Sequence, residues 1–267
     1  MRKLNELLFS ACFLAASVTS LVPSAQAQDA GATLKFGTSL GYPPFEFLGP
    51  DGKMAGFDID LGNAICEYLK RTCVWEEIDF SGMVPALKAR KFDAMLASVA
   101  MTEDRMKQVD FTDEVYRSGT RMIARTDSGL TLDPETLNGK RIGVEQGSSN
   151  EKFAKKRWAP KGVVVVTYAN QDMVYSDLVS GRLDGVLVAG VQAQLGFLST
   201  DRSAGYGFIG EAIKDSTVRD VSAIAVNKGN EGVVSDLNAA LAALHANGTY
   251  DRIAAKYFPP SLKIYGE

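Results

Sequence analysis

The sequence predicts an α/β protein in which mostly parallel sheets are covered by helices. Short apolar runs with strand character alternate with amphipathic helical segments along most of the chain. The 267 residues, 46% of them apolar and 23% charged, suit a soluble globular protein with two domains of ordinary size or one large domain. The strand and helix pattern of the first half also returns in the second half.

The first residues have the pattern of a secretory signal peptide. Arg2 and Lys3 precede an apolar stretch at 7–22, and Ala25 and Ala27 then satisfy the small-x-small rule for signal peptidase. We expect residues 1–27 to be removed on export. The apolar stretch is short for a spanning helix, which disfavours an N-terminal membrane anchor.

The first half of the exported chain is typical of a βαβ unit. Phe57, Leu61 and Ile65 recur at every fourth position and give one helix an apolar face, and Ser81 can cap the next helix. Strands that are joined through helices pair in parallel. The expected elements are strands at 34–38, 72–78 and 93–98 and helices at 57–69 and 81–90.

The second half repeats this order. Residues 87–96 and 178–187 share a helix end, a basic residue, an apolar residue, an Asp and an apolar strand. Two similar lobes would produce that likeness, although chance also produces it at helix–strand junctions. The expected elements are strands at 141–145, 163–168, 183–188 and 221–226 and helices at 149–158, 170–180, 231–247 and 250–257.

Composition and missing motifs disfavour several classes of function. The chain carries 29 Lys and Arg against 32 Asp and Glu, a net charge of -3, so the basic excess of a nucleic-acid-binding protein is absent. The motifs GxSxG, Walker A, GxGxxG and HExxH are absent, and His245 is the single histidine. We therefore expect a binding role rather than an enzyme, with no cofactor and no metal.

Two cysteines remain after residue 27. Export to an oxidising compartment favours a disulfide between Cys66 and Cys73, and their spacing lets the end of a helix reach the start of the next strand. Two free thiols are the alternative. A metal site would need more ligands than these two.

Four segments together resemble the extracellular solute-binding proteins of polar amino-acid ABC importers, with most similarity to the lysine/arginine/ornithine- and histidine-binding branch. Further matches include Tyr-Ala-Asn-Gln-Asp at 168–172, and the cysteine pair matches that branch's disulfide. The four segments are Gly-Tyr-Pro-Pro-Phe-Glu at 41–46, Gly-Phe-Asp-Ile-Asp-Leu at 56–61, Ala-Ser-Val-Ala-Met-Thr-Glu-Asp-Arg at 97–105 and Gly-Lys-Arg-Ile-Gly-Val-Glu-Gln-Gly-Ser-Ser at 139–149.

The resemblance implies a two-lobed periplasmic binding protein of type II, with two hinge strands between the lobes. A small-molecule ligand would bind in the cleft, hinge closure would bury it, and a membrane permease would receive it. Such a protein would work in the periplasm as a monomer. The implied boundaries are 28–117 plus 220–267 for the first lobe and 120–213 for the second, with hinges near 117–120 and 213–220.

The resemblance assigns a carboxylate-binding group. Arg105 would clamp the ligand carboxylate through two parallel hydrogen bonds, and its alternative is a surface ion pair. Ser98 and Ser149 would donate to the same carboxylate through hydroxyl and backbone N–H groups. Ser148 and Ser149 precede a helix, so the helix N-terminus would favour the anion. Simple N-capping is the other explanation, and both can hold at once.

The rest of the expected site departs from the family pattern. Tyr42 and Phe80 would sandwich the ligand side chain, or else belong to the core. Ala189 stands where relatives carry the Asp that binds the α-ammonium, and Ser39 stands at a second acidic position. Glu145 replaces an apolar residue, and a carboxylate exposed at the cleft edge is the alternative explanation for it.

These departures leave two ligand classes open. Either Glu145 binds the cation of a basic amino acid in a shifted pose, or the ligand lacks a free α-ammonium, as an opine or an N-substituted amino acid does. An enzymatic alternative on this fold is a periplasmic cyclohexadienyl (arogenate/prephenate) dehydratase with Glu151 as general acid. A third possibility is the sensor domain of a receptor, which a transmembrane helix would normally follow. The sequence runs to Glu267 without such a helix, so we expect no fused receptor.

Overall fold

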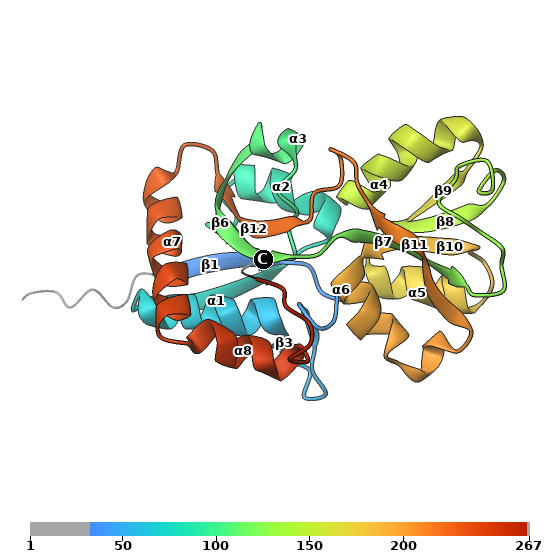
Figure 1. The fold of residues 1–267 in the computed structure, drawn as a ribbon. Helices are drawn as coiled ribbons and strands as arrows, with labels where there is room; N and C mark the ends of the chain where they lie inside the picture. The colour runs from blue at the N-terminus through green and yellow to red at the C-terminus, as the bar shows by residue number, and fades with distance from the viewer. Residues whose placement is uncertain (1–32, 266–267) are drawn as a thin grey trace, which may run out of the picture. The chain divides into compact units, whose positions relative to one another are not determined.

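A computed structural model of the chain describes residues 33–265 (Figure 1). Residues 1–32 and 266–267 lie outside the described part, and so does the expected signal peptide at 1–27. Among residues 33–265, none of the helices has the length and apolar character needed to cross a membrane.

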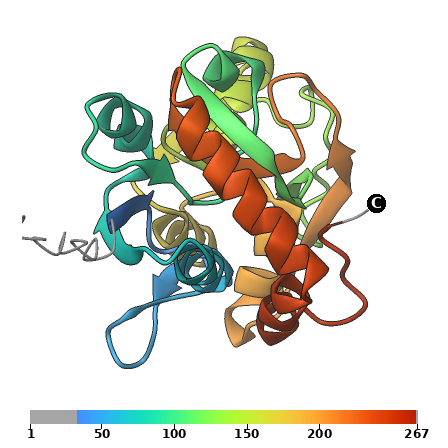
Figure 2. The same cartoon turned by 90° about the vertical axis from the view of Figure 1, so that its left-hand side faces the viewer.

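The first lobe is built around a five-stranded sheet in the order β4-β1-β5-β12-β6. Its strands are β1 (Thr33–Thr38), β4 (Thr72–Glu77), β5 (Ala94–Met95), β6 (Val109–Arg117) and β12 (Val221–Asn227). Its helices are α1 (Phe57–Tyr68), α2 (Phe80–Lys88), α3 (Glu103–Met106), α7 (Glu231–Ala246) and α8 (Thr249–Tyr257), and a small hairpin joins β2 (Phe47–Leu48) to β3 (Met54–Ala55). Helix α7 lies across β6 and packs on α1 and α8 (Figure 2).

The second lobe is built around a five-stranded sheet in the order β11-β7-β10-β8-β9. Its strands are β7 (Thr120–Arg125), β8 (Arg141–Glu145), β9 (Val164–Tyr168), β10 (Gly185–Ala189) and β11 (Tyr206–Ile213). Its helices are α4 (Ser149–Phe153), α5 (Gln171–Val179) and α6 (Gly190–Gln192), with π-helical turns at Ala154–Trp158 and Ala193–Leu198 and 3-10 turns at Ala159–Lys161 and Asp201–Ser203.

The chain passes from the first sheet to the second between β6 and β7, and it returns between β11 and β12. These two passages lie between residues 117 and 120 and between residues 213 and 221. That the lobes hinge near 117–120 and 213–220 stays a prediction. The exact lobe boundaries, 28–117 plus 220–267 and 120–213, stay a prediction.

Both sheets are mixed, which refines the expected α/β fold. In the first sheet β1 pairs in parallel with β4 and β5, but β12 runs antiparallel to β5 and β6. In the second sheet β8 pairs in parallel with β9 and β10, but β7 runs antiparallel to β10 and β11. The antiparallel pairings all involve β7 or β12, which lie next to the two passages. The chain crosses to the second sheet through β6 and β7 and returns in the opposite direction through β11 and β12.

Two local predictions need correction. Ser81 does not cap α2, because the helix begins one residue earlier at Phe80 and Asp79 holds the N-cap position. The helix expected at 149–158 is α-helical only as far as Phe153, and Ala154–Trp158 then forms a π-helix.

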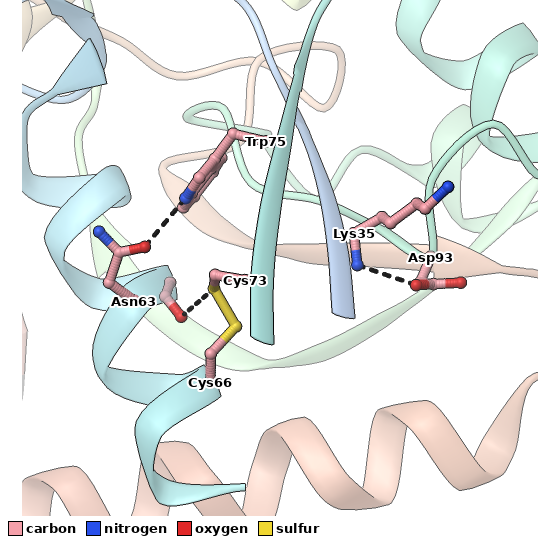
Figure 3. Close-up of a disulfide and its surroundings, with 7 residues drawn as sticks. Lys35, Asn63, Cys66, Cys73, Trp75 and Asp93 are labelled. Carbon is pink, nitrogen blue, oxygen red and sulfur yellow. Dashed lines mark hydrogen bonds between the residues drawn. A yellow bond between two sulfur atoms is a disulfide. The ribbon is translucent and has the colours of Figure 1, made fainter. Parts of the chain in front are cut away.

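The expected disulfide is present. Cys66 lies near the end of α1 and Cys73 in β4, with their Cα atoms 5.6 Å apart (Figure 3). One turn before Cys66, Asn63 accepts a hydrogen bond of 3.0 Å from the indole Nε1 of Trp75. The disulfide and this hydrogen bond both fix the second half of α1 against β4.

Candidate ligand-binding site

Side chains from both lobes line one pocket at the carboxyl ends of the parallel strands β1, β5, β8 and β10, the usual position of ligand sites in α/β folds. The pocket holds about 580 Å³ of space that no atom occupies, part of it open to solvent. All nine site residues expected from the sequence line it, namely Ser39, Tyr42, Phe80, Ser98, Arg105, Glu145, Ser148, Ser149 and Ala189.

Arg105 lies inside this pocket. Helix α3 presents it, and the N-cap hydroxyl of Thr102 accepts a hydrogen bond from the Arg105 backbone N–H. The residue is only 9% exposed, and its guanidinium carbon lies 5.0 Å from the centre of the Phe80 ring. Its Nη1 donates to the carbonyl of Ala100 at 3.0 Å and its Nη2 to the carbonyl of Gly147 at 3.2 Å. Burial lowers the Arg105 pKa to about 10, so the group stays charged at neutral pH and is not a surface ion pair.

Glu145 is buried in the same pocket at the end of β8. It is 8% exposed, so the alternative of a carboxylate exposed at the cleft edge is wrong. Burial raises its pKa to about 8; the nearby charge of Arg105 opposes this shift, and Asp79 adds to it. A buried carboxyl with such a pKa ionises readily when a cation binds beside it.

Ser148 is the N-cap residue of α4. Its hydroxyl accepts the backbone N–H of Glu151 at 3.0 Å and donates to the carbonyl of Glu145 at 2.7 Å. The N-capping interpretation is therefore confirmed for Ser148. Ser149 is the first residue of the helix and also lines the pocket.

Tyr42 and Phe80 face the pocket and contact the core at the same time. Tyr42 is 9% exposed, and its ring centre lies 6.1 Å from that of Phe45. Phe80 packs on the apolar cluster beneath α2. Both aromatic residues thus pack against the core and also line the pocket, and their contact with a ligand side chain stays a prediction.

Ser98 uses its donors within its own lobe. Its φ of 53° is in the left-handed region, which is rare for a residue with a side chain. The backbone N–H donates to Asp58 Oδ2 at 2.8 Å, and the hydroxyl donates to Glu46 Oε2 at 3.3 Å. The expected ligand donors of Ser98 are therefore already bonded in this structure.

Sequence reasoning missed part of the pocket. Glu46 belongs to the quoted segment 41–46, which was the available signal, but it was given no role. Ala189 and Ser39 line the same pocket as Glu46, and Ser39 is 5% exposed. The other lining residues are Glu46, Ala97, Ala100, Ser118, Thr120, Asn150, Gln171, Arg219 and Ser222.

Glu151 lies outside this pocket. Its Oε2 accepts the backbone N–H of Gly147 at 2.6 Å, and its Oε1 pairs with Lys155 Nζ at 2.7 Å. A carboxylate that is held by these two partners is poorly placed to serve as a general acid. Within residues 33–265 no cluster of His, Cys, Asp and Glu could hold a metal ion.

Residues 34–260 match the family model described as bacterial extracellular solute-binding proteins, family 3. The chain belongs to this family. It is 42% identical over 254 residues to an L-arginine-binding protein of Pseudomonas aeruginosa, covering 95% of this chain and 96% of the relative. It is 39% identical over 236 residues to the lysine/arginine/ornithine-binding periplasmic protein of Escherichia coli, covering 88% and 90%.

Solved structures of the family share the fold. An ancestral arginine-binding protein bound to arginine matches with a TM-score of 0.78 and 36% identity, over 85% of this chain and 99% of that one. An ancestral amino-acid-binding protein, described as a precursor of cyclohexadienyl dehydratase, matches with a TM-score of 0.74 and 27% identity, over 85% and 96%. The similarity thus extends through both lobes.

Proposed function

We propose that this protein is the periplasmic solute-binding component of an ABC importer and that it captures a cationic amino acid. The observation that carries the proposal is the burial of a guanidinium and a carboxyl group, Arg105 from the first lobe and Glu145 from the second, in one pocket. The arginine- and lysine-binding relatives support the ligand class.

The two charges assign the ends of the ligand. Arg105 binds the ligand carboxylate, because the planar guanidinium matches a carboxylate through paired hydrogen bonds. Glu145 binds the cationic side chain, and Tyr42 and Phe80 cover its apolar part. Rotation of the lobes about the two passages opens the pocket for entry and release.

The remaining properties belong to the same proposal. Export with removal of residues 1–27 delivers a monomer to the periplasm, where the membrane permease receives the ligand. The protein acts as a carrier and not as a dehydratase, and the bonds that Glu151 makes to Gly147 and Lys155 support this. Incubation with prephenate and arogenate without product formation tests that point.

A second ligand class is favoured by one observation. Ala189 lines the pocket without a carboxylate at the position where relatives bind the α-ammonium. An opine or another N-substituted amino acid would need no such partner. Opines are therefore included in the binding test described next.

The test is a thermal-shift panel on exported protein that has been unfolded and refolded to remove ligand. The panel contains basic, neutral and acidic amino acids and opines, and a ligand at a hundred times its dissociation constant should add about 2.7 kcal/mol of stability. Arg105→Ala should abolish every shift, whereas Glu145→Gln should abolish only the shift from cationic ligands. Normal binding by Arg105→Ala would refute the proposal.

A further inference from the structure

A pair of buried acids without a cation lies at the base of the pocket. Glu46 is 2% exposed and lines the pocket, and Asp58 is fully buried behind it. No Lys or Arg of the described residues forms an ion pair with either acid. Glu145, in contrast, lies near the guanidinium of Arg105. The region around Glu46 is therefore an acidic part of the pocket in which no described Lys or Arg pairs with the carboxyl groups.

The backbone holds Glu46 firmly in this position. Tyr42 and Glu46 form a bridge in which the Tyr42 N–H donates to the Glu46 carbonyl at 2.9 Å. Gly56 has a φ of 126°, and a Cβ at this position would lie 2.5 Å from the carbonyl carbon of Phe45. Only glycine lets α1 begin so close to this turn.

Ser98 connects the acid pair to the carboxylate-binding region. It bonds Asp58 through its N–H and Glu46 through its hydroxyl, and it lines the pocket together with Arg105. The Asp58 Oδ1 atom and the Tyr116 hydroxyl nearby are buried without a partner. Burial and Asp58 raise the Glu46 pKa well above its usual range, so the pair retains a proton until a cation replaces it.

We infer that Glu46 binds the α-ammonium of the ligand and thereby takes the role of the acidic residue that is absent at Ala189. In an amino acid the ammonium and the carboxylate are bonded to the same carbon. An ammonium beside Glu46 is thus compatible with a carboxylate at Arg105, since Ser98, which donates to Glu46, lines the same pocket as Arg105. The inference rests on the proposed function and names a ligand class with a free α-ammonium rather than an N-substituted one.

The closing experiment compares L-arginine with δ-guanidinovalerate, which is arginine without the α-amino group, by isothermal titration calorimetry. We expect Glu46→Gln to weaken L-arginine binding by at least about tenfold and δ-guanidinovalerate binding by less than about threefold. The matched variant Glu145→Gln should weaken both ligands, because both keep the guanidinium. The thermal midpoint of ligand-free Glu46→Gln should not fall, since the substitution removes a buried acid without a cation.

Each outcome decides the matter. Unchanged L-arginine binding in Glu46→Gln, or an equal loss for the two ligands, overturns the assignment of Glu46 and leaves the proposed function standing. If the unsubstituted protein binds none of the free amino acids in the panel, both the proposed ligand class and this inference are wrong.

Discussion

Lys152 of the second lobe and Asp104 of the first lobe form an ion pair between the lobes, in a groove that adjoins the ligand pocket. The pair lies beside the contact in which Arg105 donates to the Gly147 carbonyl, which also joins the lobes. Both charged side chains are about half exposed, so the pair can form only when the lobes are close and is screened by salt.

Lys152→Gln should weaken ligand binding modestly. Exposed pairs contribute about 0–1 kcal/mol, so we expect up to about a fivefold rise in the dissociation constant at low ionic strength. The difference should vanish at about 1 M salt, where the screening length is about 3 Å. Calorimetric titrations at the two salt concentrations measure this effect.

The matched control is Lys155→Gln. Lys155 pairs with Glu151 within the second lobe, so removing its charge should leave the affinity unchanged. Equal losses in the two variants would show that general charge, and not the cross-lobe pair, sets the effect.

Gly147→Ala should impair binding more severely. Gly147 has a φ of 78°, and a Cβ there would lie 2.6 Å from the Cα of Ser81 on the opposite lobe. Because backbone atoms cannot give way easily, we expect a loss of affinity of at least about tenfold, or about 1.4 kcal/mol. Titration calorimetry on the ligand-stripped protein measures it.

Gly139→Ala is the control that distinguishes the effect of the Ser81 contact from the effect of the left-handed backbone conformation. Gly139 has a φ of 73° but no atom within 4 Å of a new Cβ. Both substitutions should cost about 1 kcal/mol of folding stability for the left-handed conformation, but only Gly147→Ala should weaken binding. A similar loss of affinity in Gly139→Ala would contradict the role of the Ser81 contact.

Binding of a cationic ligand should strengthen as the pH rises from about 6 to about 8. Burial raises the Glu145 pKa to about 8, so the carboxyl must lose a proton before it can pair with a cation. Arg105 stays charged over this range, since its pKa is about 10. Titrations in buffers of different ionisation enthalpy should show proton release, and Glu145→Gln should release fewer protons.

The stability of the ligand-free protein should change in the opposite direction. The folded state raises the Glu145 pKa from 4.5 to about 8 and so binds the proton more tightly than the unfolded chain. The contribution of Glu145 to the free energy of unfolding is fully present below about pH 4.5, and it is lost as the pH rises through about 8. Thermal midpoints across this range check the sign, and an identical profile for Glu145→Gln would refute it.

Local sequence patterns predicted the parts of the fold that depend on local contacts. Helices α1, α5 and α7 and strands β1, β8 and β9 lie close to their expected bounds, because each has a clear apolar period or run. Strands β6, β7 and β11 were not identified. β6 pairs with β12 and β7 pairs with β10, and both partners are distant in sequence. Pairing with a distant strand leaves no periodic pattern of apolar residues within the strand itself.

The family resemblance predicted which residues line the pocket. It did not predict the protonation of a residue such as Glu145, because that depends on how deeply the folded protein buries the side chain. Arg105 and Glu145 both line the pocket, but the depth of Glu145 and the pKa that follows from it depend on the opposite lobe. The role of Glu46 became visible only through its hydrogen bond to Ser98, which lies 52 residues from Glu46 and 40 residues from Asp58 along the chain. No spacing rule connects positions so far apart.

The turn at residues 42–46 limits where substitutions could change the ligand specificity of this protein. The carbonyls of Pro44 and Phe45 accept the first N–H groups of α1, both at 2.9 Å, so this turn also determines where a helix starts. Substitutions there would disturb folding together with recognition. The backbone carbonyl of Glu145 accepts the hydroxyl of Ser148, the N-cap of α4, but its side chain forms no hydrogen bond within the described residues. New specificities are therefore better introduced by changing this side chain.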